Sequence, residues 1–285
     1  MHKYSLTLGI AVATCMGVYS AQAIIIGTDP NQLTNIVADP TAQVGCIGHL
    51  PASCVQTNNG YAMEWNGGAN DELNLTNVAI RSGDGSTNAL KIGSGLGATI
   101  TNCVFNGGGS GPAVQIYPNN GSTSFMAVYL SHSLITGGSN TNAGAVEVKP
   151  SGSTSVGLHF NHVEISGANY GIRSDGSLLS SGSSVSTFVS DSEFFALTVA
   201  AVNAFSSAGT GTVLATFDNT HILSAGVGLK ANGPLSSVVL TNNTVTGNGI
   251  GIQQVNGATV RTSGNNTIQN NTTNISGTLT PVTTN

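Results

Sequence analysis

The feature that most constrains the fold is a short phrase that recurs along the chain, of which LTNNTV at residues 240–245 is one copy. Each copy opens on an apolar residue, has Asn, His or Asp two places later, and has a second apolar residue five places after the first. The opening residues are Leu75, Ile100, Leu130, Phe160, Val189, Phe217 and Leu240. Successive copies lie 23 to 30 residues apart. This pattern indicates one structural unit repeated about eight times.

Short segments between the phrases alternate in polarity, as in Ala89–Ile92, Ala113–Ile116 and Ala145–Val148. A period of two indicates a β-strand, and no stretch has the 3.6-residue spacing of an amphipathic helix. Units of this size cannot bury their apolar faces alone, whereas stacked units share one continuous core. The sequence therefore predicts an all-β solenoid, a parallel β-helix of about eight coils over residues 61–275. Equivalent positions in successive coils should lie ~4.8 Å apart.

The polar residue of the phrase is expected at a corner between two strands. Asn tolerates a left-handed backbone and bonds neighbouring main-chain groups better than other non-glycine residues. In stacked coils such residues form a column whose amides bond to the coils above and below. The predicted members of this corner column are Asn77, Asn102, His132, His162, Asp191, Asn219, Asn242 and Asn265.

The alternating segments also predict a row of side chains that point outward from successive coils. Its members are Glu64, Lys91, Gln115, Glu147, Arg173, Asn203, Lys230 and Gln253. One interpretation is structural, because Glu147 and Arg173 are opposite charges in adjacent coils and stabilise the stack slightly. Glu64 and Lys91 form a second such pair. The other interpretation is functional: the row binds the hydroxyl groups of a sugar chain, with Arg173 and Glu147 at its centre.

A second group of polar residues lies four places after the apolar anchors. Glu164, Glu193 and His221 should project outward from adjacent coils. Two carboxylates one coil apart are near the roughly 5 Å spacing used by retaining glycosidases, and their repulsion would raise one pKa. An in-register stack also brings equivalent residues together without any function, so both interpretations stay open.

Three members of the corner column have the chemistry of metal ligands. His132, His162 and Asp191 would place two imidazoles and a carboxylate in successive coils. The alternative is that they replace Asn and bond the backbone at a corner. We adopt the second interpretation and expect no metal site.

The first residues have the features of a secretory signal peptide, residues 1–23. Lys3 supplies a positive charge, an apolar stretch follows, and Ala21-Gln22-Ala23 forms a cleavage site. The apolar stretch is too short to span a bilayer comfortably. We therefore expect a secreted or periplasmic protein, with residues 24–60 as an N-terminal cap and residues 276–285 as a loose tail. In such an oxidising compartment Cys46 and Cys54 are the expected disulfide.

The charge balance excludes one class of partner. Without the signal peptide, which contains Lys3, the chain has six Lys and Arg residues and 12 Asp and Glu residues. Phosphate binding needs clustered Lys and Arg, so nucleic acid is not an expected partner. No other stretch is apolar enough to cross a membrane. Cys103 is expected to be a buried apolar residue, because no further ligands stand at zinc-binding spacing.

The phrases Gly67-Gly68-Ala69-Asn70-Asp71 and Thr241-Asn242-Asn243-Thr244-Val245-Thr246-Gly247-Asn248 carry a family resemblance. With them the chain resembles the right-handed parallel β-helix of the pectate-lyase-like superfamily, also called the pectin lyase fold. It looks most like secreted bacterial β-helix proteins of undetermined function. The resemblance covers residues 61–275 and implies the fold. Its implications for activity are broad, because the superfamily holds lyases, hydrolases, esterases and non-enzymatic surface proteins.

Two functions follow as expectations. The first is a non-catalytic scaffold or weak saccharide-binding protein, whose partner is a polysaccharide or cell-envelope glycan and which needs no cofactor. The second is a polysaccharide lyase or glycoside hydrolase acting on a uronate-type polymer, with calcium as a cofactor only if it is a lyase. Its candidate catalytic residues are Arg173, Glu147, Glu164 and Glu193. The aspartate array typical of pectate lyases is missing, which favours the first.

Overall fold

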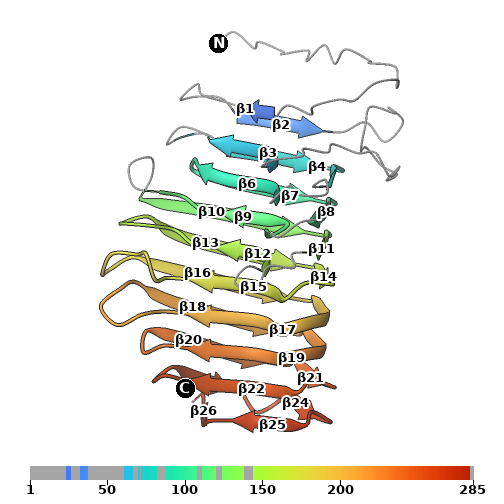
Figure 1. The fold of residues 1–285 in the computed structure, drawn as a ribbon, viewed down its shortest axis with the longest axis vertical. Helices are drawn as coiled ribbons and strands as arrows, with labels where there is room; N and C mark the ends of the chain where they lie inside the picture. The colour runs from blue at the N-terminus through green and yellow to red at the C-terminus, as the bar shows by residue number, and fades with distance from the viewer. Residues whose placement is uncertain are drawn as a thin grey trace.

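The chain is built as a stack of β-strand coils in a computed structural model (Figure 1). The structure describes residues 61–66, 70, 72–81, 88–107, 111–119, 124–137 and 144–282, with the backbone of β1 (Ile24–Ile26) and β2 (Leu33–Val37). Every named element in these ranges is a strand, and all their pairings are parallel. Within them no helix is long and apolar enough to cross a membrane. The predicted all-β parallel solenoid is confirmed.

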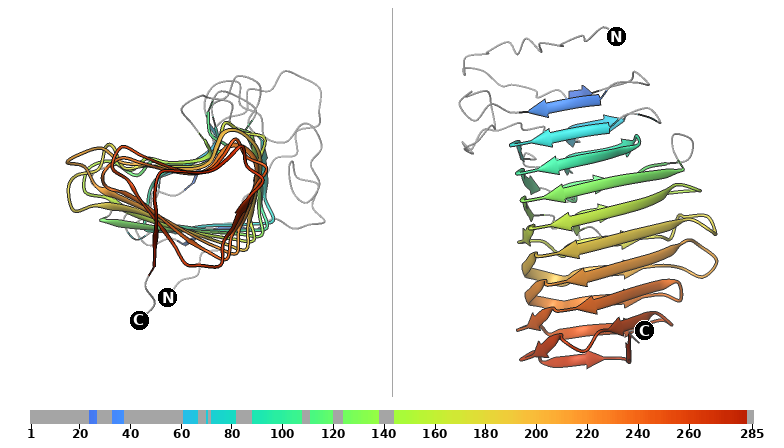
Figure 2. Two further views of the ribbon diagram at one scale, coloured as in Figure 1. Left: turned by 90° about the horizontal axis from the view of Figure 1, so that it is seen from below. Right: turned by 180° about the vertical axis from the view of Figure 1, so that it is seen from behind.

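One side of the stack is a ten-stranded sheet, sheet B. Its strands are, in order along the sheet, β2, β4 (Glu72–Thr76), β7 (Gly97–Thr101), β10 (Phe125–Ser131), β13 (Ser155–Asn161), β16 (Ser184–Ser190), β18 (Thr212–Asp218), β20 (Ser236–Thr241), β23 (Thr259–Thr262) and β26 (Leu279–Pro281). Each coil contributes one strand. Seen along the axis, successive coils lie over one another (Figure 2).

The remaining sides belong to the sixteen-stranded sheet A, which has two rows. The first row is β1, β3 (Tyr61–Asn66), β6 (Asn88–Ser94), β9 (Val114–Ile116), β12 (Gly144–Val148), β15 (Tyr170–Asp175), β22 (Ile250–Val255) and β25 (Thr273–Ser276). The second row is β5 (Ala79–Arg81), β8 (Val104–Gly107), β11 (Leu134–Gly137), β14 (Glu164–Ser166), β21 (Thr244–Thr246) and β24 (Thr267–Gln269). The long strands β17 (Glu193–Phe205) and β19 (His221–Asn232) run through both rows.

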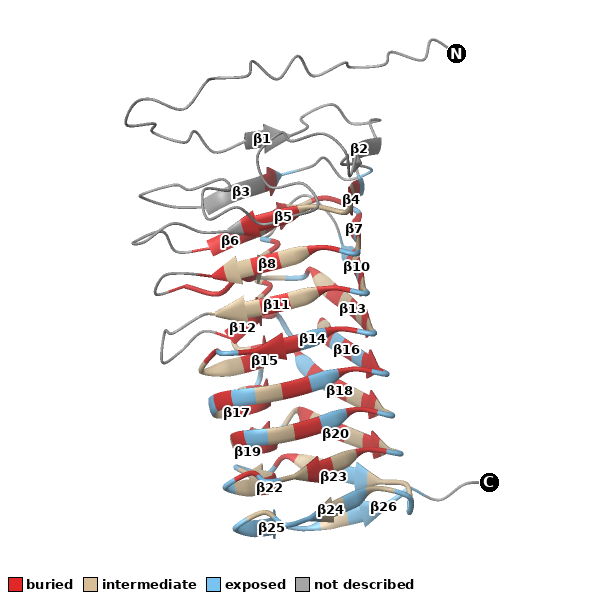
Figure 3. Ribbon diagram, turned by 90° about the vertical axis from the view of Figure 1, so that its right-hand side faces the viewer, coloured by how far each residue is buried: buried red, intermediate tan, exposed pale blue. Residues whose placement is uncertain are grey.

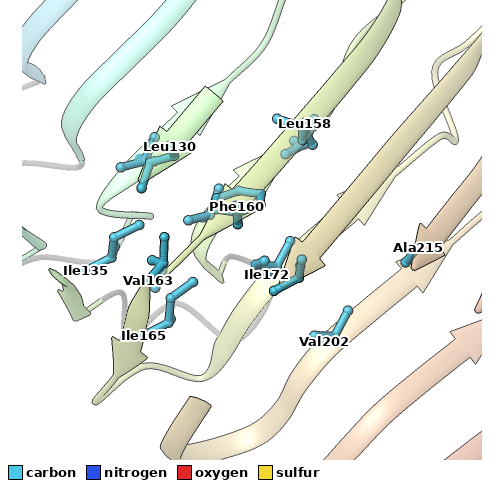
Figure 4. Close-up of a cluster of buried hydrophobic side chains, with 14 of the residues drawn as sticks. Leu130, Ile135, Leu158, Phe160, Val163, Ile165, Ile172, Val202 and Ala215 are labelled. Atoms are coloured by element: carbon cyan, nitrogen blue, oxygen red, sulfur yellow. The ribbon is translucent and has the colours of Figure 1, made fainter. Parts of the chain in front are cut away.

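The core is a set of columns of apolar side chains inside the coils. In sheet B, Leu130 pairs with Phe160, and Phe160 with Val189. Each of the three is at most 1% exposed. Buried residues alternate with partly or fully exposed ones along these strands, and the apolar side chains meet inside the solenoid (Figures 3 and 4). Fully burying each such side chain contributes about 1.5–3 kcal/mol, so the stacking register is strongly specified.

The ends of the solenoid differ from the expected boundaries. Strand β2 lies in the segment assigned to the cap, and β26 lies in the segment assigned to a loose tail. These two strands account for the difference between the expected eight coils and the ten strands of sheet B. Leu279 of β26 continues the column of Val260 and packs against the core, which explains why the tail is ordered there. The predicted signal peptide and the pair Cys46 and Cys54 lie outside the described residues.

The corner column has the predicted backbone conformation at its first seven positions. The φ angles of Asn77, Asn102, His132, His162, Asp191, Asn219 and Asn242 lie between 48° and 57°. The side chains also bond between coils: Asn102 donates to Asn77 Oδ1 at 2.5 Å, and Asn219 donates to Asp191 Oδ1 at 2.6 Å. These left-handed residues turn the chain from sheet B into the second row of sheet A.

Asn265 is an exception to the corner column. It is not among the residues with positive φ, although its amide donates to Asn242 Oδ1. The register explains this: Leu240 pairs with Thr262 and Val245 with Ile268, so the last corner holds one more residue than the corner before it.

A buried polar column runs beside the exposed one, one residue further along the chain. Ser133 Oγ accepts a hydrogen bond from Cys103 N, Ser192 Oγ accepts one from Val163 N, and Asn243 Oδ1 accepts one from Thr220 N, all at 3.0–3.1 Å. Each side chain satisfies the backbone N–H of the preceding coil, which the bend removes from the strand ladder. Cys103 itself is buried, as predicted, and its thiol is free. Burial raises the pKa of this thiol to about 11.

Candidate functional site

The predicted outward row follows the register of the first row of sheet A. Lys91 pairs with Gln115, Gln115 with Glu147, and Glu147 with Arg173. The series continues through Asn203, Lys230 and Gln253. The backbone of Glu64 pairs with that of Lys91, but the side chain of Glu64 lies outside the described residues. Equivalent positions therefore do stack coil upon coil.

The centre of this row is not the open polar stripe that alternation suggests. Glu147 is 5% exposed and Asn203 is 6% exposed, and all five residues of β12 are buried. A two-residue period shows which side chains share a face of the strand, but it does not show whether solvent reaches that face. Burial here changes the chemistry, because a buried charge must be compensated by partners within the protein.

Five side chains compensate one another, and we call them the charged row: Tyr117, Glu147, Lys149, Arg173 and Asp175. Arg173 lies between two carboxylates, with Nη2 2.9 Å from Asp175 Oδ2 and Nη1 3.6 Å from Glu147 Oε1. Lys149 Nζ lies 3.6 Å from the same Asp175 oxygen, and the hydroxyl of Tyr117 donates to Glu147 Oε2. The backbone N–H of Ser177 donates to Asp175 Oδ1 at 2.9 Å. All four carboxylate oxygens therefore have partners.

The environment of Glu147 shifts two pKa values. Burial raises the pKa of Glu147, and the hydrogen bond from Tyr117 and the charges of Arg173 and Lys149 oppose that rise. Burial, and then the hydrogen bond to Glu147, raise the pKa of the Tyr117 phenol well above its ordinary range. Tyr117 therefore stays protonated and acts as a donor to the carboxylate.

Two buried polar atoms, one in the charged row and one beside it, have no hydrogen-bond partner. They are Nε of Arg173 and Oδ1 of Asn203, which occupy paired positions in adjacent coils. One is a donor and the other an acceptor. Near Arg173, in the described part of the chain, these are the buried side-chain atoms that could still form a hydrogen bond.

Glu164 and Glu193 are brought together as predicted. They occupy paired positions on β14 and β17, and Glu193 pairs in turn with His221. All three are exposed, and their strands β14, β17 and β19 lie on the side of the solenoid that faces the viewer in Figure 3. These carboxylates therefore lie on a different row from Glu147 and Arg173, so the four candidate catalytic residues do not form one site.

The histidines of the corner column stack on one another. The rings of His132 and His162 are nearly parallel, with their centroids 5.0 Å apart. His162 Nδ1 is hydrogen-bonded to Asn161 Oδ1 at 2.7 Å, and Asn161 also donates to Asp191 Oδ2 at 3.1 Å. Ring stacking and amide bonds thus replace the Asn–Asn contacts of other corners. In the described ranges no group of three or more His, Cys, Asp or Glu side chains is placed to hold a metal ion.

The sequence reasoning missed three members of the charged row. Each of them follows a predicted row member by two places: Tyr117 follows Gln115, Lys149 follows Glu147, and Asp175 follows Arg173. Because side chains two places apart share a face of a strand, the same alternation predicts that they lie on the face of the row. Asp175 is the most buried of them, at 1% exposed.

No family model, no curated protein and no solved structure matches this chain. What is shown is therefore the class: a parallel β-helix protein.

Proposed function

We propose that the protein is a secreted or periplasmic, non-catalytic β-helix that serves as a rigid scaffold and binds saccharide weakly. The observation that carries this proposal is that the side chains of the charged row are paired with one another. Two carboxylates and two cations neutralise one another, and each carboxylate oxygen already has a partner. General acid–base catalysis needs a group that reaches a substrate proton. Glu147 and Asp175 are instead buried and held by their neighbours.

The distribution of aspartates supports the same proposal. Asp175 belongs to the first row of sheet A, Asp191 to the corner column, and Asp218 to the outer face of sheet B. They do not converge as the aspartates of pectate lyases do. A relation to that superfamily, and to its secreted bacterial members, is part of our proposal and is supported by the parallel solenoid fold.

One observation favours the second candidate function, a polysaccharide lyase or glycoside hydrolase. Burial raises the pKa of Glu147, as it does for many catalytic acids, and Arg173 keeps an unpartnered donor. A calcium ion does not fit the charged row, because Asp175 and Glu147 already bond cations rather than present free oxygens. The second candidate therefore has an acid but no free base and no calcium ligands among the row residues.

The test is release of product from polygalacturonate and alginate, with and without added calcium. Unsaturated ends are followed by ultraviolet absorbance and reducing ends by a colorimetric assay. We expect no release above background. Calcium-dependent cleavage that disappears in Arg173→Ala would overturn the proposal in favour of a lyase. Hydrolysis that disappears in Glu193→Gln would overturn it in favour of a hydrolase acting at the Glu164 and Glu193 pair.

A further inference from the structure

The outer face of sheet B carries an exposed aromatic column that runs along the solenoid. Tyr129 pairs with His159, and His159 with Phe188, in three successive coils. The ring centroids of Tyr129 and His159 lie 6.0 Å apart, and those of His159 and Phe188 lie 5.0 Å apart. Tyr129 is 53% exposed and Phe188 is 38% exposed. Large side chains are thus held in register where solvent reaches them.

Two further apolar side chains widen this surface. Phe125, at the start of β10, is 50% exposed, and Leu214 on β18 is 40% exposed. The ring of Phe125 lies over Gly157 in the next coil, where a Cβ atom would come within 2.8 Å of the ring. We call Phe125, Tyr129, His159, Phe188 and Leu214 the aromatic face. A contiguous exposed patch of this kind on one sheet marks a binding surface more often than single scattered residues do.

The aromatic face carries no carboxylate, ammonium or guanidinium group. Its columns contain only Gly, Ala, Ser, Thr and apolar neighbours between β7 and β20, besides the five residues that define it. The whole chain, in contrast, has a formal net charge of −5. An uncharged ligand therefore meets no electrostatic penalty on this face, whereas a polyanion finds no counter-charge among these columns and meets the Asp218 carboxylate at their edge.

Hydroxyl and amide groups line both sides of the aromatic column, and one of these rows ends on the carboxylate of Asp218 in β18. On one side Thr101 and Ser131 are hydrogen-bonded at 3.2 Å, and Asn161 donates to Ser190 Oγ at 2.8 Å. On the other side Ser184 N donates to Ser155 Oγ at 3.0 Å. Rings at the centre and hydroxyl groups at the edges match a sugar ribbon, whose C–H faces stack on aromatic rings while its hydroxyl groups point sideways.

The spacing of the rings along a straight line favours some sugar linkages over others. Tyr129 and Phe188 lie two coils apart, roughly 10 Å along the axis. This separation is comparable with the length of a disaccharide unit in an extended, β-1,4-linked chain, in which alternate rings present equivalent faces. An α-linked chain curves away from such a line. Two rings in register at this separation thus fit a straight, ribbon-like polymer.

We infer that the aromatic face binds an extended, uncharged, β-1,4-linked glycan, with sugar rings stacked on Tyr129 and Phe188. The inference deepens the proposed function, because it names the surface and the class of glycan, and it rests on the protein being a glycan-binding one. It places the ligand on sheet B and not on the charged row of sheet A. The hydroxyl groups of Ser131 and Ser155 flank the bound chain.

The experiment is a depletion assay on microcrystalline cellulose and on chitin, with insoluble starch and polygalacturonate as comparison polymers. We expect binding to the first two and not to the others. Each of Tyr129→Ala and Phe188→Ala should weaken binding roughly fivefold, and the double variant roughly 25-fold, as expected from two stacking contacts. Tyr129→Phe and Phe188→Tyr keep the rings and should bind as the parent does. Ile275→Ala removes an exposed aliphatic side chain from sheet A and is the matched control.

Three outcomes would overturn the inference. One is binding to cellulose that survives the double variant with correctly folded protein. Another is equal binding to starch, because the class of glycan would then be wrong. The third is a dimer that the double variant converts to monomer without any glycan binding, because the face would then be an interface between copies of this chain. Product release from polygalacturonate would overturn the proposed function alone, since the cellulose and chitin isotherms do not depend on it.

Discussion

The outer positions of the two sheets follow the same stacking rule and have opposite characters. On sheet A, Glu147 and Arg173 pair in adjacent coils, are largely buried, and direct their charges at one another. On sheet B, Tyr129 and Phe188 stand two coils apart, exposed and uncharged. In-register stacking places side chains from equivalent positions of successive coils next to one another. Where the position is buried the result is an internal network, and where it is exposed the result is a surface that no other described segment covers.

This difference separates stability from binding. Desolvated charges must find partners, and the loss of one partner leaves the other uncompensated. These rings contribute less to folding than core side chains do, because 53% of Tyr129 and 38% of Phe188 stay in water in the folded state. Substitutions on the charged row should therefore change the free energy of unfolding, whereas substitutions on the aromatic face should change binding and leave stability nearly unchanged.

The largest effect is expected for Asp175→Asn. The change removes the carboxylate that pairs Arg173 and Lys149, at a position 1% exposed. We expect a loss of about 3 kcal/mol in the free energy of unfolding, measured by urea denaturation. Asp191→Asn is the matched control, because it changes an exposed carboxylate of the corner column to the residue typical of that column. Equal losses in the two variants would show that the charged row has no special role.

A smaller loss is expected for Tyr117→Phe. The change leaves one oxygen of the buried Glu147 carboxylate without its donor, which costs about 1–3 kcal/mol. Because the hydrogen bond from Tyr117 lowers the pKa of Glu147, that pKa should rise further in the variant. Tyr117→Phe in a Glu147→Leu background, which has no side-chain acceptor for the Tyr117 hydroxyl, is the control. A loss of the same size in both backgrounds would mean that packing of the ring, and not the hydrogen bond, explains the effect.

The pH dependence of stability sharpens the comparison further. Since burial raises the pKa of Glu147 above 4.5 in the folded state, the folded protein binds this proton more tightly than the unfolded chain does. The stability contributed by protonation is fully present below pH 4.5 and is lost as the pH rises through the folded-state pKa. Glu147→Gln should therefore gain stability relative to the parent across that window. Ile275→Ala changes an exposed side chain without removing a titratable group and should show no such trend; equal trends would contradict the assignment.

Much of the fold could be predicted because its determinants are local and repeat. The apolar anchors such as Leu130 and Phe160 recur at coil spacing, and the left-handed corners require Asn or a substitute, so strand order and register follow from the sequence. The extent of the solenoid was less predictable. Strands β2 and β26 lack the complete phrase, and their pairing with neighbouring coils decides their conformation.

The candidate site was only partly predictable, for a different physical reason. Spacing identified Glu147 and Arg173 as neighbours, because register follows from period. Burial depends on what lies beside each strand, so the sequence could not show that this row is desolvated while Tyr129 is exposed. The aromatic face was not predicted because Tyr129, His159 and Phe188 each stand directly before a core anchor, and the repeat of the anchors alone explains the fold. Their spacing of 30 and 29 residues equals that of the anchors Leu130, Phe160 and Val189, and this is the signal that identifies the column.

A small effect on stability is expected for the double variant Tyr129→Ala and Phe188→Ala. Cross-strand aromatic contacts contribute roughly 0.2–1 kcal/mol, and both rings are exposed. We expect a loss below about 1 kcal/mol in urea denaturation, alongside the large loss of glycan binding. A loss comparable with that of Asp175→Asn would mean that the aromatic face is a structural element, and the contrast between the two sheets would fail.

The smallest effect on stability is expected for Gly157→Ala. This change moves the ring of Phe125 without removing any residue of the aromatic face. The new Cβ atom would lie 2.8 Å from Cζ of Phe125, at the far end of a flexible side chain, so the ring can move aside at little cost. We expect a change in the free energy of unfolding below about 0.5 kcal/mol, because Ala is the better strand residue of the two. Cellulose binding should weaken about twofold through loss of the flat ring. In a Phe125→Ala background the same change should have no effect on binding; a further loss there would show that Gly157 itself approaches the glycan.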